Sequence, residues 1–203
     1  MKRLFDLVAV IVTSPLWLPL AALVALLVRV KLGAPVFFRQ PRPGRAGVIF
    51  EVIKFRTMRE ARDATGRLLP DAERLTPFGR WLRGTSLDEL PELWNVLRGE
   101  MSLVGPRPLL VQYLDRYSAR QARRHEVRPG LTGLSQVMGR NAISWEEKLE
   151  WDVRYVETRS FWLDLKILLL TGGAVLRGTG VSPRGEATMP EFNPGARRPD
   201  AAP

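Results

Sequence analysis

The stretch that decides the fold is Ser86-Leu87-Asp88-Glu89-Leu90-Pro91, which continues into Glu92-Leu93-Trp94-Asn95-Val96-Leu97-Arg98-Gly99. Apolar residues recur here at the spacing of one helix face: Leu87, Leu90, Leu93, Trp94 and Leu97. This spacing predicts a helix that buries one side. Two adjacent carboxylates, Asp88 and Glu89, stand near its start in a chain that is otherwise strongly basic.

One interpretation of these carboxylates is helix capping. Ser86 and Glu89 are three residues apart, as in a capping box, where each side chain binds a free backbone N–H of the first turn. Pro91 complicates this interpretation, because a proline at the fifth position of a helix removes a backbone hydrogen bond. The helix can therefore begin nearer Pro91, which leaves Asp88 and Glu89 in the turn before it.

The other interpretation is catalytic. A carboxylate held ionised among Lys and Arg side chains can attack phosphorus and form an aspartyl-phosphate. The cations would bind the phosphates and stabilise the charge that develops on the transferred group. In both interpretations Asp88 lies at a helix start, where the helix dipole favours an ionised carboxylate.

Several predicted elements bring basic residues toward the carboxylates. Residues 49–57 alternate as a strand does, which points Lys54 and Arg56 to one face. Residues 76–84 predict a short helix with a threonine N-cap, a proline in first position and a glycine just past the end. This helix places Arg83 immediately before the carboxylate pair.

Arg107 stands between Pro106 and Pro108. A residue before proline is restricted to extended conformations, so the Arg107 side chain is presented on a stiff backbone. Taken alone, each of these basic residues could be a solvated surface charge. Their gathering around one carboxylate pair is what predicts a phosphate site.

The order of these motifs resembles that of the monotopic phosphoglycosyl transferases, or bacterial sugar transferases. The matching elements are Lys2-Arg3 with Asp6, Ser14-Pro15, Lys54-Phe55-Arg56-Thr57-Met58, the stretch from Ser86 to Pro91, Met101-Ser102-Leu103-Val104-Gly105-Pro106-Arg107-Pro108, Arg128-Pro129-Gly130-Leu131-Thr132-Gly133-Leu134-Ser135-Gln136-Val137, Gly139-Arg140-Asn141 and Asp164-Leu165-Lys166-Ile167. The resemblance covers roughly residues 1 to 180 and is to the small form of the family, which is little more than the catalytic unit.

The resemblance implies a two-step transfer on the cytoplasmic face of the bacterial inner membrane. Asp88 would attack the β-phosphate of a UDP-sugar and release UMP, and a polyprenyl (undecaprenyl) phosphate would then accept the phosphosugar from the enzyme. The product would be a polyprenyl-diphosphate-sugar, which begins the synthesis of an exopolysaccharide, O-antigen, capsule or glycoprotein glycan. The sequence leaves open which sugar is transferred and whether the chain forms a homo-oligomer.

The resemblance also implies roles for individual residues. Asp88 is expected to be catalytic and the best protein ligand for Mg²⁺, a hard cation that prefers carboxylate and phosphate oxygens and would offset their mutual repulsion. Glu89 is expected to be its catalytic partner and to position the metal or the leaving phosphate. The expected substrate contacts are Lys54 and Arg107 foremost, followed by Arg83, Arg128, Gln136 and Arg140.

The composition narrows the alternatives. The chain has 203 residues, a net charge of +10, no cysteine and one histidine. One domain is the default for this length, and the charge favours an anionic partner. Thiolate metal sites and Ser-His-Asp triads lack the residues that they need.

The competing class of function is a non-enzymatic, membrane-anchored basic module for nucleic acid or anionic lipid. However, the basic residues are scattered among Pro and Gly turns without a zinc or RNA-recognition motif, so no nucleic-acid partner is expected.

The amino terminus predicts contact with membrane lipids. Residues 4–28 are apolar except for Asp6, Thr13 and Ser14, which is long enough to cross a bilayer core of ~30 Å. Ser14-Pro15 lies near the middle, where proline breaks or kinks a helix. Positive residues flank both ends, which tends to keep both ends cytoplasmic. These features favour a re-entrant helix hairpin with its bend at Ser14 and Pro15, as the resemblance also implies. A kinked spanning helix is the alternative.

The carboxy-terminal half predicts two more helices. Ser144-Trp145-Glu146-Glu147 matches a capping box. Residues 161–170 combine aromatic and aliphatic residues with two charges, which fits an amphipathic helix in the membrane interface, although a buried core helix fits equally well. The predicted fold is α+β, mostly helical with a small β element at residues 36–38 and 48–57. The predicted parts are a re-entrant anchor (1–31), a cytoplasmic catalytic domain (32–180) and a flexible tail (181–203).

Overall fold

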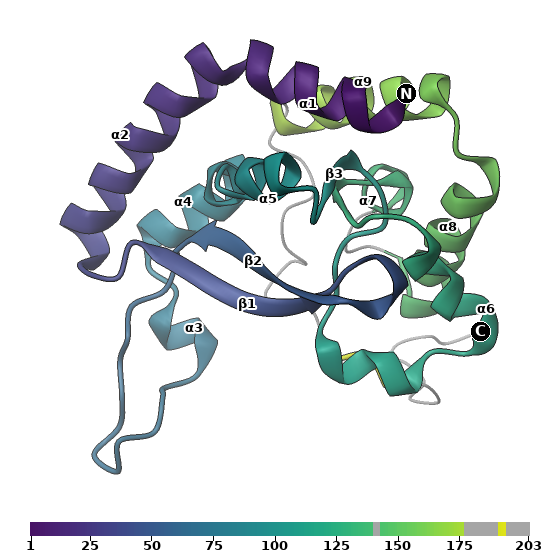
Figure 1. Ribbon diagram of the computed structural model, residues 1–203. Helices are drawn as coiled ribbons and strands as arrows, with labels where there is room; N and C mark the ends of the chain where they lie inside the picture. The colour runs from purple at the N-terminus through teal and green to yellow at the C-terminus, as the bar shows by residue number, and fades with distance from the viewer. Residues whose placement is uncertain (140–142, 177–190, 194–203) are drawn as a thin grey trace.

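A computed structural model describes residues 1–139, 143–176 and 191–193 (Figure 1). Its helices are α1 (Lys2–Val12), α2 (Ser14–Leu32), α3 (Asp71–Arg74), α4 (Pro77–Thr85), α5 (Glu92–Arg98), α6 (Ala119–Ala122), α7 (Leu134–Met138), α8 (Trp145–Thr158) and α9 (Phe161–Leu176), with 3₁₀ segments η1 (Arg45–Gly47), η2 (Leu87–Glu89), η3 (Val111–Arg116) and η4 (Arg123–Glu126). The strands are β1 (Phe37–Pro43), β2 (Ile49–Phe55), β3 (Ser102–Val104) and β4 (Gly130–Thr132). The predicted α+β class, mostly helical, is confirmed. Most of the predicted tail lies outside the described residues.

The strands form two small sheets. The β1 and β2 strands pair antiparallel, with Phe37 opposite Phe55 and Pro43 opposite Ile49, so the first strand is longer than predicted. The sequence prediction missed the second sheet, in which β3 and β4 pair in parallel. Backbones approach closely beside this pair, since a Cβ atom on Gly130 would lie 2.1 Å from the amide nitrogen of Gly105. Only glycine permits that contact, which joins the β4 segment to the loop that carries Arg107.

The α4 helix begins as its sequence predicts. The hydroxyl of Thr76 accepts a hydrogen bond from the Gly79 amide at 3.0 Å, and a proline follows it at the first helical position. The helix ends at Thr85, one residue beyond the predicted glycine stop, and Ser86 takes the left-handed conformation there (φ 56°). Gly79 lies so close to the Thr57 carbonyl that a side chain would not fit. This contact sets α4 against the end of β2.

The prediction that Ser86 caps the next helix is wrong. Its side chain makes no capping hydrogen bond, because the left-handed residue serves instead to end α4. The α5 helix begins at Glu92, with Pro91 at the N-cap position, so Asp88 and Glu89 lie in the separate turn η2. The alternative in which the helix starts near Pro91 is confirmed.

Asn95 fastens α5 to β2. It is fully buried, and its side-chain oxygen accepts a hydrogen bond from the Ile53 amide at 3.1 Å. Its amide nitrogen donates to the Glu51 carbonyl at 2.7 Å. One side chain thus bonds the backbone of β2 at two points, which fixes the helix that follows the carboxylate turn relative to the strand that carries Lys54.

The apolar amino-terminal segment is broken at Thr13, one residue before the predicted bend. Ser14 and Pro15 form the first turn of α2, and the helix continues through Pro19. The break leaves backbone carbonyls of α1 without helical partners. The Trp17 indole N–H donates to the Val10 carbonyl at 3.0 Å, and the Thr13 hydroxyl donates to the Ala9 carbonyl at 2.7 Å. At the bend, side chains of Thr13 and Trp17 thus supply a partner for the Val10 carbonyl.

The α1 helix is attached to the rest of the protein by charged side chains. Lys2 pairs with Asp164 of α9 at 2.5 Å. Arg3 donates to the Val96 and Leu97 carbonyls at the end of α5, where a cation is favoured by the helix dipole. Buried Asp6 accepts from the Ser102 hydroxyl at 2.8 Å. Figure 1 shows α1 and α9 side by side along one edge of the molecule, with α2 running away from them.

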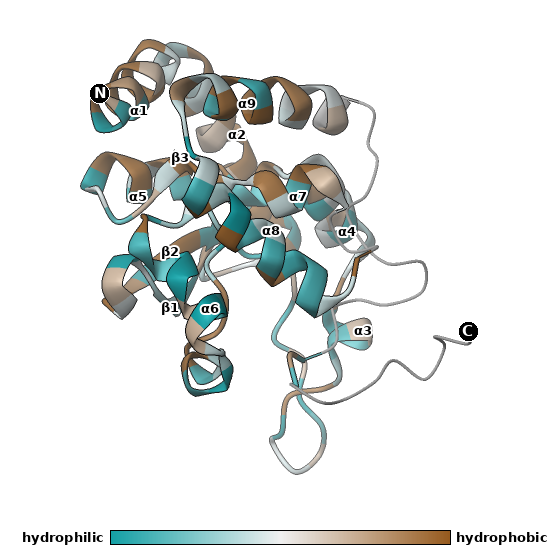
Figure 2. Ribbon diagram, turned by 90° about the vertical axis from the view of Figure 1, so that its right-hand side faces the viewer, coloured by the Kyte–Doolittle hydropathy of each residue, from teal (hydrophilic) through white to brown (hydrophobic). Residues whose placement is uncertain are grey.

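The helices along this edge, α1, α2 and α9, are rich in apolar residues (Figure 2), and many of these side chains are exposed. Among the described residues, α2 is the helix long and apolar enough to cross a membrane. The exposed apolar side chains of the three helices are Leu4, Val8, Ile11, Val12, Leu16, Leu18, Leu20, Leu23, Leu26, Val30, Phe161, Trp162, Leu169 and Leu170. The opposite face of α9 buries Ile167 against Val104 and Tyr155. Helix α9 thus combines the two predicted possibilities, since one face is core and the other exposed. The predicted capping box at Ser144 is confirmed at the start of α8.

Candidate active site

The carboxylate turn η2 lies against the end of β2, within a group of buried and half-buried charges. The Lys54 ammonium lies 2.7 Å from Glu89 Oε1 and 2.9 Å from Glu92 Oε1. Arg107 donates a hydrogen bond from its guanidinium to the same Glu89 oxygen. The antiparallel pairing of β1 and β2 and the Asn95 bonds to β2 set the position of Lys54, and the proline-flanked loop after β3 sets that of Arg107. Residues up to 53 positions apart in sequence thus meet around one turn.

Glu89 is held in its charged form. Burial opposes its ionisation, but Arg107 and then Lys54 outweigh burial and hold the pKa of Glu89 well below its usual range. The same attraction, against the penalty of burial, raises the pKa of Lys54. Glu89 therefore serves as a fixed anion that orients two cations, rather than as a group that exchanges protons near neutral pH.

Asp88 behaves in the opposite way. It is buried, and among the described residues its carboxylate accepts no hydrogen bond. Burial, followed by the negative charge of Glu89, raises the pKa of Asp88 to about 7, while Lys54, Arg107 and Arg83 act against the shift. A buried carboxylate that is free of hydrogen bonds and faces cations is suited to attack an electrophile that those cations bind.

Arg83 reaches this site from α4. Its Nε donates to the Thr57 hydroxyl at 3.1 Å. Burial lowers the pKa of Arg83, and Asp88 opposes the effect, which places the two charges near one another. Lys54, Arg83 and Arg107 are the predicted substrate contacts that the structure brings to Asp88 and Glu89.

Other predicted contacts lie elsewhere. Arg128 donates from Nε to the Gly99 carbonyl at 2.8 Å and so joins the β4 segment to the end of α5. Gln136 donates to the Leu131 carbonyl at 3.2 Å within the β4–α7 region. Arg56, predicted to share a face with Lys54, lies just past the end of β2 and donates to the carbonyls of Leu32 and Ala34. Arg140 lies outside the described residues.

The sequence prediction did not single out two charged residues of this site. Glu92, the first residue of α5, is buried and bonds to Lys54. It stands three residues after Glu89, and that spacing places two side chains on one side of a helical turn, so it could have been found. Arg42 of β1 donates to Gln40 at 2.6 Å and approaches the Pro108 carbonyl at 3.4 Å. Burial and then Arg107 lower the pKa of Arg42 to about 10. No local sequence pattern predicts that Arg42 belongs to this site.

The backbone of Arg107 is held by a buried ion pair. Arg124 donates from Nη2 to the Arg107 carbonyl at 2.6 Å and pairs with Asp152 of α8 at 2.8 Å. Both charged side chains are almost completely buried. Removing one partner of such a pair leaves an uncompensated buried charge. Arg124 therefore links the backbone of the Arg107 loop to Asp152 of α8.

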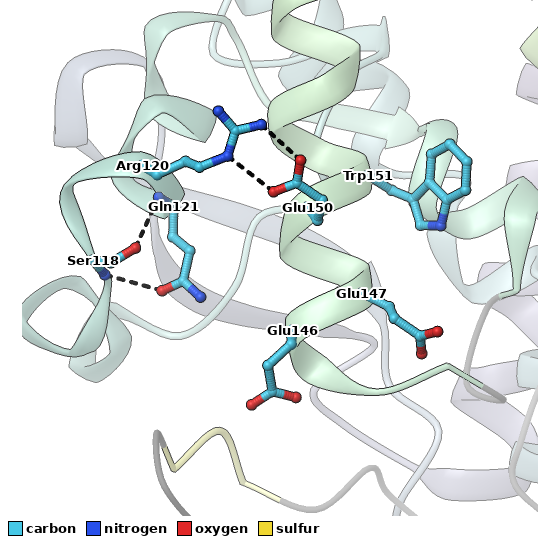
Figure 3. Close-up of a pocket in the computed structure, with 7 residues that line it drawn as sticks. All are labelled: Ser118, Arg120, Gln121, Glu146, Glu147, Glu150 and Trp151. Carbon is cyan, nitrogen blue, oxygen red and sulfur yellow. Dashed lines mark hydrogen bonds and ion pairs between the residues drawn. The ribbon is translucent and has the colours of Figure 1, made fainter.

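A surface hollow of about 560 Å³ lies between α6 and α8, away from this group (Figure 3). It is lined by Ser118, Arg120, Gln121, Glu146, Glu147, Glu150 and Trp151. Arg120 spans it to Glu150 at 2.6 Å, and Gln121 and Ser118 complete a capping box. Four of its polar residues thus bind one another in two pairs, and none of the residues around Asp88 belongs to it.

The site fits a divalent cation only if the substrate supplies ligands. In the described part of the chain, no three metal-ligating side chains converge. Glu89 and Glu92 are neutralised by Lys54 and Arg107, which leaves the Asp88 carboxylate. Mg²⁺ is commonly held by one or two carboxylates together with substrate phosphates. Asp88 beside a bound diphosphate matches that donor set.

Comparison with known proteins gives the family. Residues 1–178 match the bacterial sugar transferase family. The chain is 54% identical over 192 residues to the uncharacterized sugar transferase EpsL of Bacillus subtilis, covering 95% of each protein. It is 43% identical over 185 residues to the UDP-glucose:undecaprenyl-phosphate glucose-1-phosphate transferase of Caulobacter vibrioides (86% of this chain, 69% of the relative). It is 41% identical over 197 residues to the UDP-galactose-lipid carrier transferase of Erwinia amylovora (89% and 41%).

The chain belongs to the bacterial sugar transferase family and is an enzyme. The resemblance inferred from the motifs is thus confirmed. The alternative of a non-enzymatic basic module is excluded.

Proposed function

We propose that this enzyme transfers a hexose 1-phosphate from a UDP-sugar to undecaprenyl phosphate through a covalent intermediate on Asp88. Relatives named for glucose and galactose transfer support the donor and acceptor classes. The observation that carries the proposal is the contrast within η2: Glu89 is committed to two cations, whereas Asp88 is unbonded among the described residues and faces the same cations.

In the first step, a carboxylate oxygen of Asp88 forms a bond to the β-phosphorus of the donor. The bond from that phosphorus to the oxygen shared with the α-phosphate breaks, and UMP leaves with the electron pair. Lys54, Arg83 and Arg107 stabilise the charge on the phosphoryl oxygens and on the leaving UMP. Glu89 keeps Lys54 and Arg107 oriented toward the diphosphate.

In the second step, a phosphate oxygen of undecaprenyl phosphate attacks the same phosphorus. The acyl-phosphate bond breaks, which returns the Asp88 carboxylate and gives undecaprenyl-diphosphate-hexose. A Mg²⁺ bound by Asp88 and the donor phosphates would reduce the repulsion between these anions. The two steps use one carboxylate and no external acid, since both leaving groups are stable anions.

The lipid acceptor requires that the site face a membrane. We propose that α1 and α2 form a re-entrant hairpin in the inner membrane, with both ends on the cytoplasmic side, and that the exposed face of α9 lies in the interface. The exposed apolar side chains of these three helices support this arrangement, because so large an apolar surface is rare on a soluble monomer.

The test is UMP release from UDP-glucose and UDP-galactose by purified enzyme with undecaprenyl phosphate and Mg²⁺ in detergent. Wild type should release UMP and form a labelled enzyme adduct from a donor labelled in its β-phosphate. Asp88→Asn should lose both while it stays folded, and Asp71→Asn in α3 serves as the matched control. If Asp88→Asn keeps more than a small fraction of wild-type turnover, Asp88 is not the nucleophile.

A further inference from the structure

Two residues near the carboxyl end, Glu191 and Phe192, bind the rest of the protein, and Asn193 beside them is exposed (Figure 1, yellow). Phe192 is 1% exposed and lies in an aromatic socket. Its ring packs against Tyr113, Tyr117 and Trp145, with ring centroids 5.5–5.8 Å apart.

Polar contacts define the register of this segment. The Phe192 amide donates to the Tyr113 hydroxyl at 3.1 Å, and Arg116 donates to the Phe192 carbonyl at 2.6 Å. Arg116 and Gln112 both bind the Glu191 carboxylate, at 2.8 and 2.6 Å. A phenylalanine that is buried, bonded at both backbone groups and preceded by a paired glutamate is a specific docking contact rather than a chance collapse.

The socket is continuous with the Arg107 loop. Leu109, two residues after Arg107, belongs to the same buried cluster as Phe192, Tyr113 and Leu149. The η3 segment that carries Tyr113, Arg116 and Gln112 follows directly. Phe192 therefore shares a buried cluster with the chain just after Arg107, while Arg124 binds the Arg107 carbonyl.

We infer that Phe192 is a positioning residue for Arg107: docking of residues 191–193 into the Tyr113–Tyr117–Trp145 socket holds the 108–113 segment, which in turn places the Arg107 guanidinium at the carboxylate turn. The inference deepens the proposed function, because it assumes that Arg107 contacts the donor diphosphate. It assigns a role in donor binding to a part of the chain far from Asp88 in sequence.

The kinetic test uses the full chain with Phe192→Ala, Phe192→Leu and, as the matched control, Asn193→Ala, whose side chain is exposed. Phe192→Ala should raise the KM for the UDP-sugar about tenfold with a smaller change in kcat, since small displacements of a substrate-binding group have effects of this order or more. Phe192→Leu should retain most of the affinity, and Asn193→Ala should match wild type.

A double-mutant cycle separates positioning from general destabilisation. In an Arg107→Lys background, Phe192→Ala should raise the KM little further, because the group that it positions has already been changed. An equal fold-change in both backgrounds would overturn the inference, as would a wild-type KM in Phe192→Ala.

Hydrogen–deuterium exchange of residues 105–113 provides a readout that does not depend on the reaction. Phe192→Ala should speed exchange there and leave β2 unchanged, and a synthetic peptide of residues 189–194 should restore part of the protection. Unchanged exchange at 105–113 would refute the coupling even if the enzyme turns over UDP-sugars. Faster exchange with no UMP release by wild type would uphold the coupling and refute the proposed function instead.

Discussion

Asp88 and Glu89 are neighbours in one turn, yet their surroundings separate them chemically. Glu89 is bonded to Lys54 and Arg107, so it is ionised across the physiological range. Asp88 has the same cations nearby without a bond to them, so burial dominates and raises its pKa to about 7. Adjacent carboxylates whose pKa values shift in opposite directions commonly have different roles in an active site.

The raised pKa of Asp88 predicts a pH dependence of turnover. Only the ionised carboxylate can attack phosphorus, and the ionised fraction grows as the pH rises through about 7. We expect kcat/KM for the UDP-sugar to rise by about tenfold from pH 6 to pH 8, because this ratio reports the groups of the free enzyme. Steady-state assays over this range measure it. A profile that is flat or falls would contradict the assignment of Asp88.

The same shift predicts an effect on stability. The pKa of Asp88 in the folded protein, about 7, exceeds its unfolded value of about 3.9, so the folded state binds more protons between these limits. Stability from this group is present below about pH 4 and is lost as the pH rises through 7. The asparagine in Asp88→Asn does not titrate. The difference in melting temperature between Asp88→Asn and wild type should therefore shift in favour of the variant from pH 5 to pH 8. A difference in melting temperature that stays constant over this pH range would contradict the raised pKa of Asp88.

Glu92 offers a third test at this scale. Glu92→Gln keeps the shape of the side chain but removes one of two carboxylates that bind Lys54. We expect a fall in kcat/KM of about tenfold with little loss of stability, since Lys54 keeps Glu89 but loses part of its orientation. Glu73→Gln in α3, an exposed position, is the control. Equal activity of both variants would show that Glu92 does not position Lys54.

At the scale of elements, the helix break at Thr13 allows a test of the proposed re-entrant hairpin. Single cysteines inserted after Met1 and placed at Lys31 should both react with an impermeant reagent from the cytoplasmic side of inverted vesicles. Trp17→Phe should shift some molecules toward a spanning form, because it leaves the Val10 carbonyl with only the long 3.4 Å bond from the Thr13 hydroxyl in an apolar setting, where weak bonding is costly. Trp162→Phe, an exposed tryptophan on α9, is the control. Labelling of the amino end from the periplasmic side alone would rule out the hairpin.

Sequence patterns predicted those elements whose signals are local. The α4 helix has its threonine cap and proline, α8 has a complete capping box, and the sequence of β2 predicts a strand. The β3–β4 pair was missed, because three-residue strands joined across 25 intervening residues leave no periodic pattern. The prediction for Ser86 was wrong because no sequence pattern shows its left-handed backbone. In that conformation Ser86 ends α4 and does not cap the following helix.

At the scale of the whole molecule, the apolar amino-terminal segment (residues 1–31) contributes to the core of the rest of the protein. Val10 packs with Val52, Val96 and Met101, and Val24 and Val28 pack with Phe55 and Leu82. The sequence shows these valines as part of an apolar run, so it could not tell which of them face protein. Likewise the cation cluster at Asp88 could be predicted from motifs, whereas Arg42 and the Phe192 socket depend on contacts distant in sequence.

Removing residues 1–31 should therefore destabilise the body rather than only detach it from the membrane. Each buried valine contributes roughly 1.5–3 kcal/mol, and the bonds of Lys2, Arg3 and Asp6 are lost as well. Thermal unfolding in detergent, compared with the Leu16→Ser variant that changes only an exposed position, measures the effect. If the truncated protein has the same melting temperature as the full chain, the part of the protein after residue 31 folds without the amino-terminal segment.

The ion pair between Lys2 and Asp164 joins residues 162 positions apart. A ribosome that adds about 5–20 residues per second needs roughly 8–32 s to pass from one to the other. During that interval α1 can already bind the rest of the chain, because the partners of Arg3 and Asp6, which are Val96, Leu97 and Ser102, are made before Asp164. Helix α1 is therefore attached in two stages, first to α5 and Ser102 and only near the end of synthesis to Asp164 of α9.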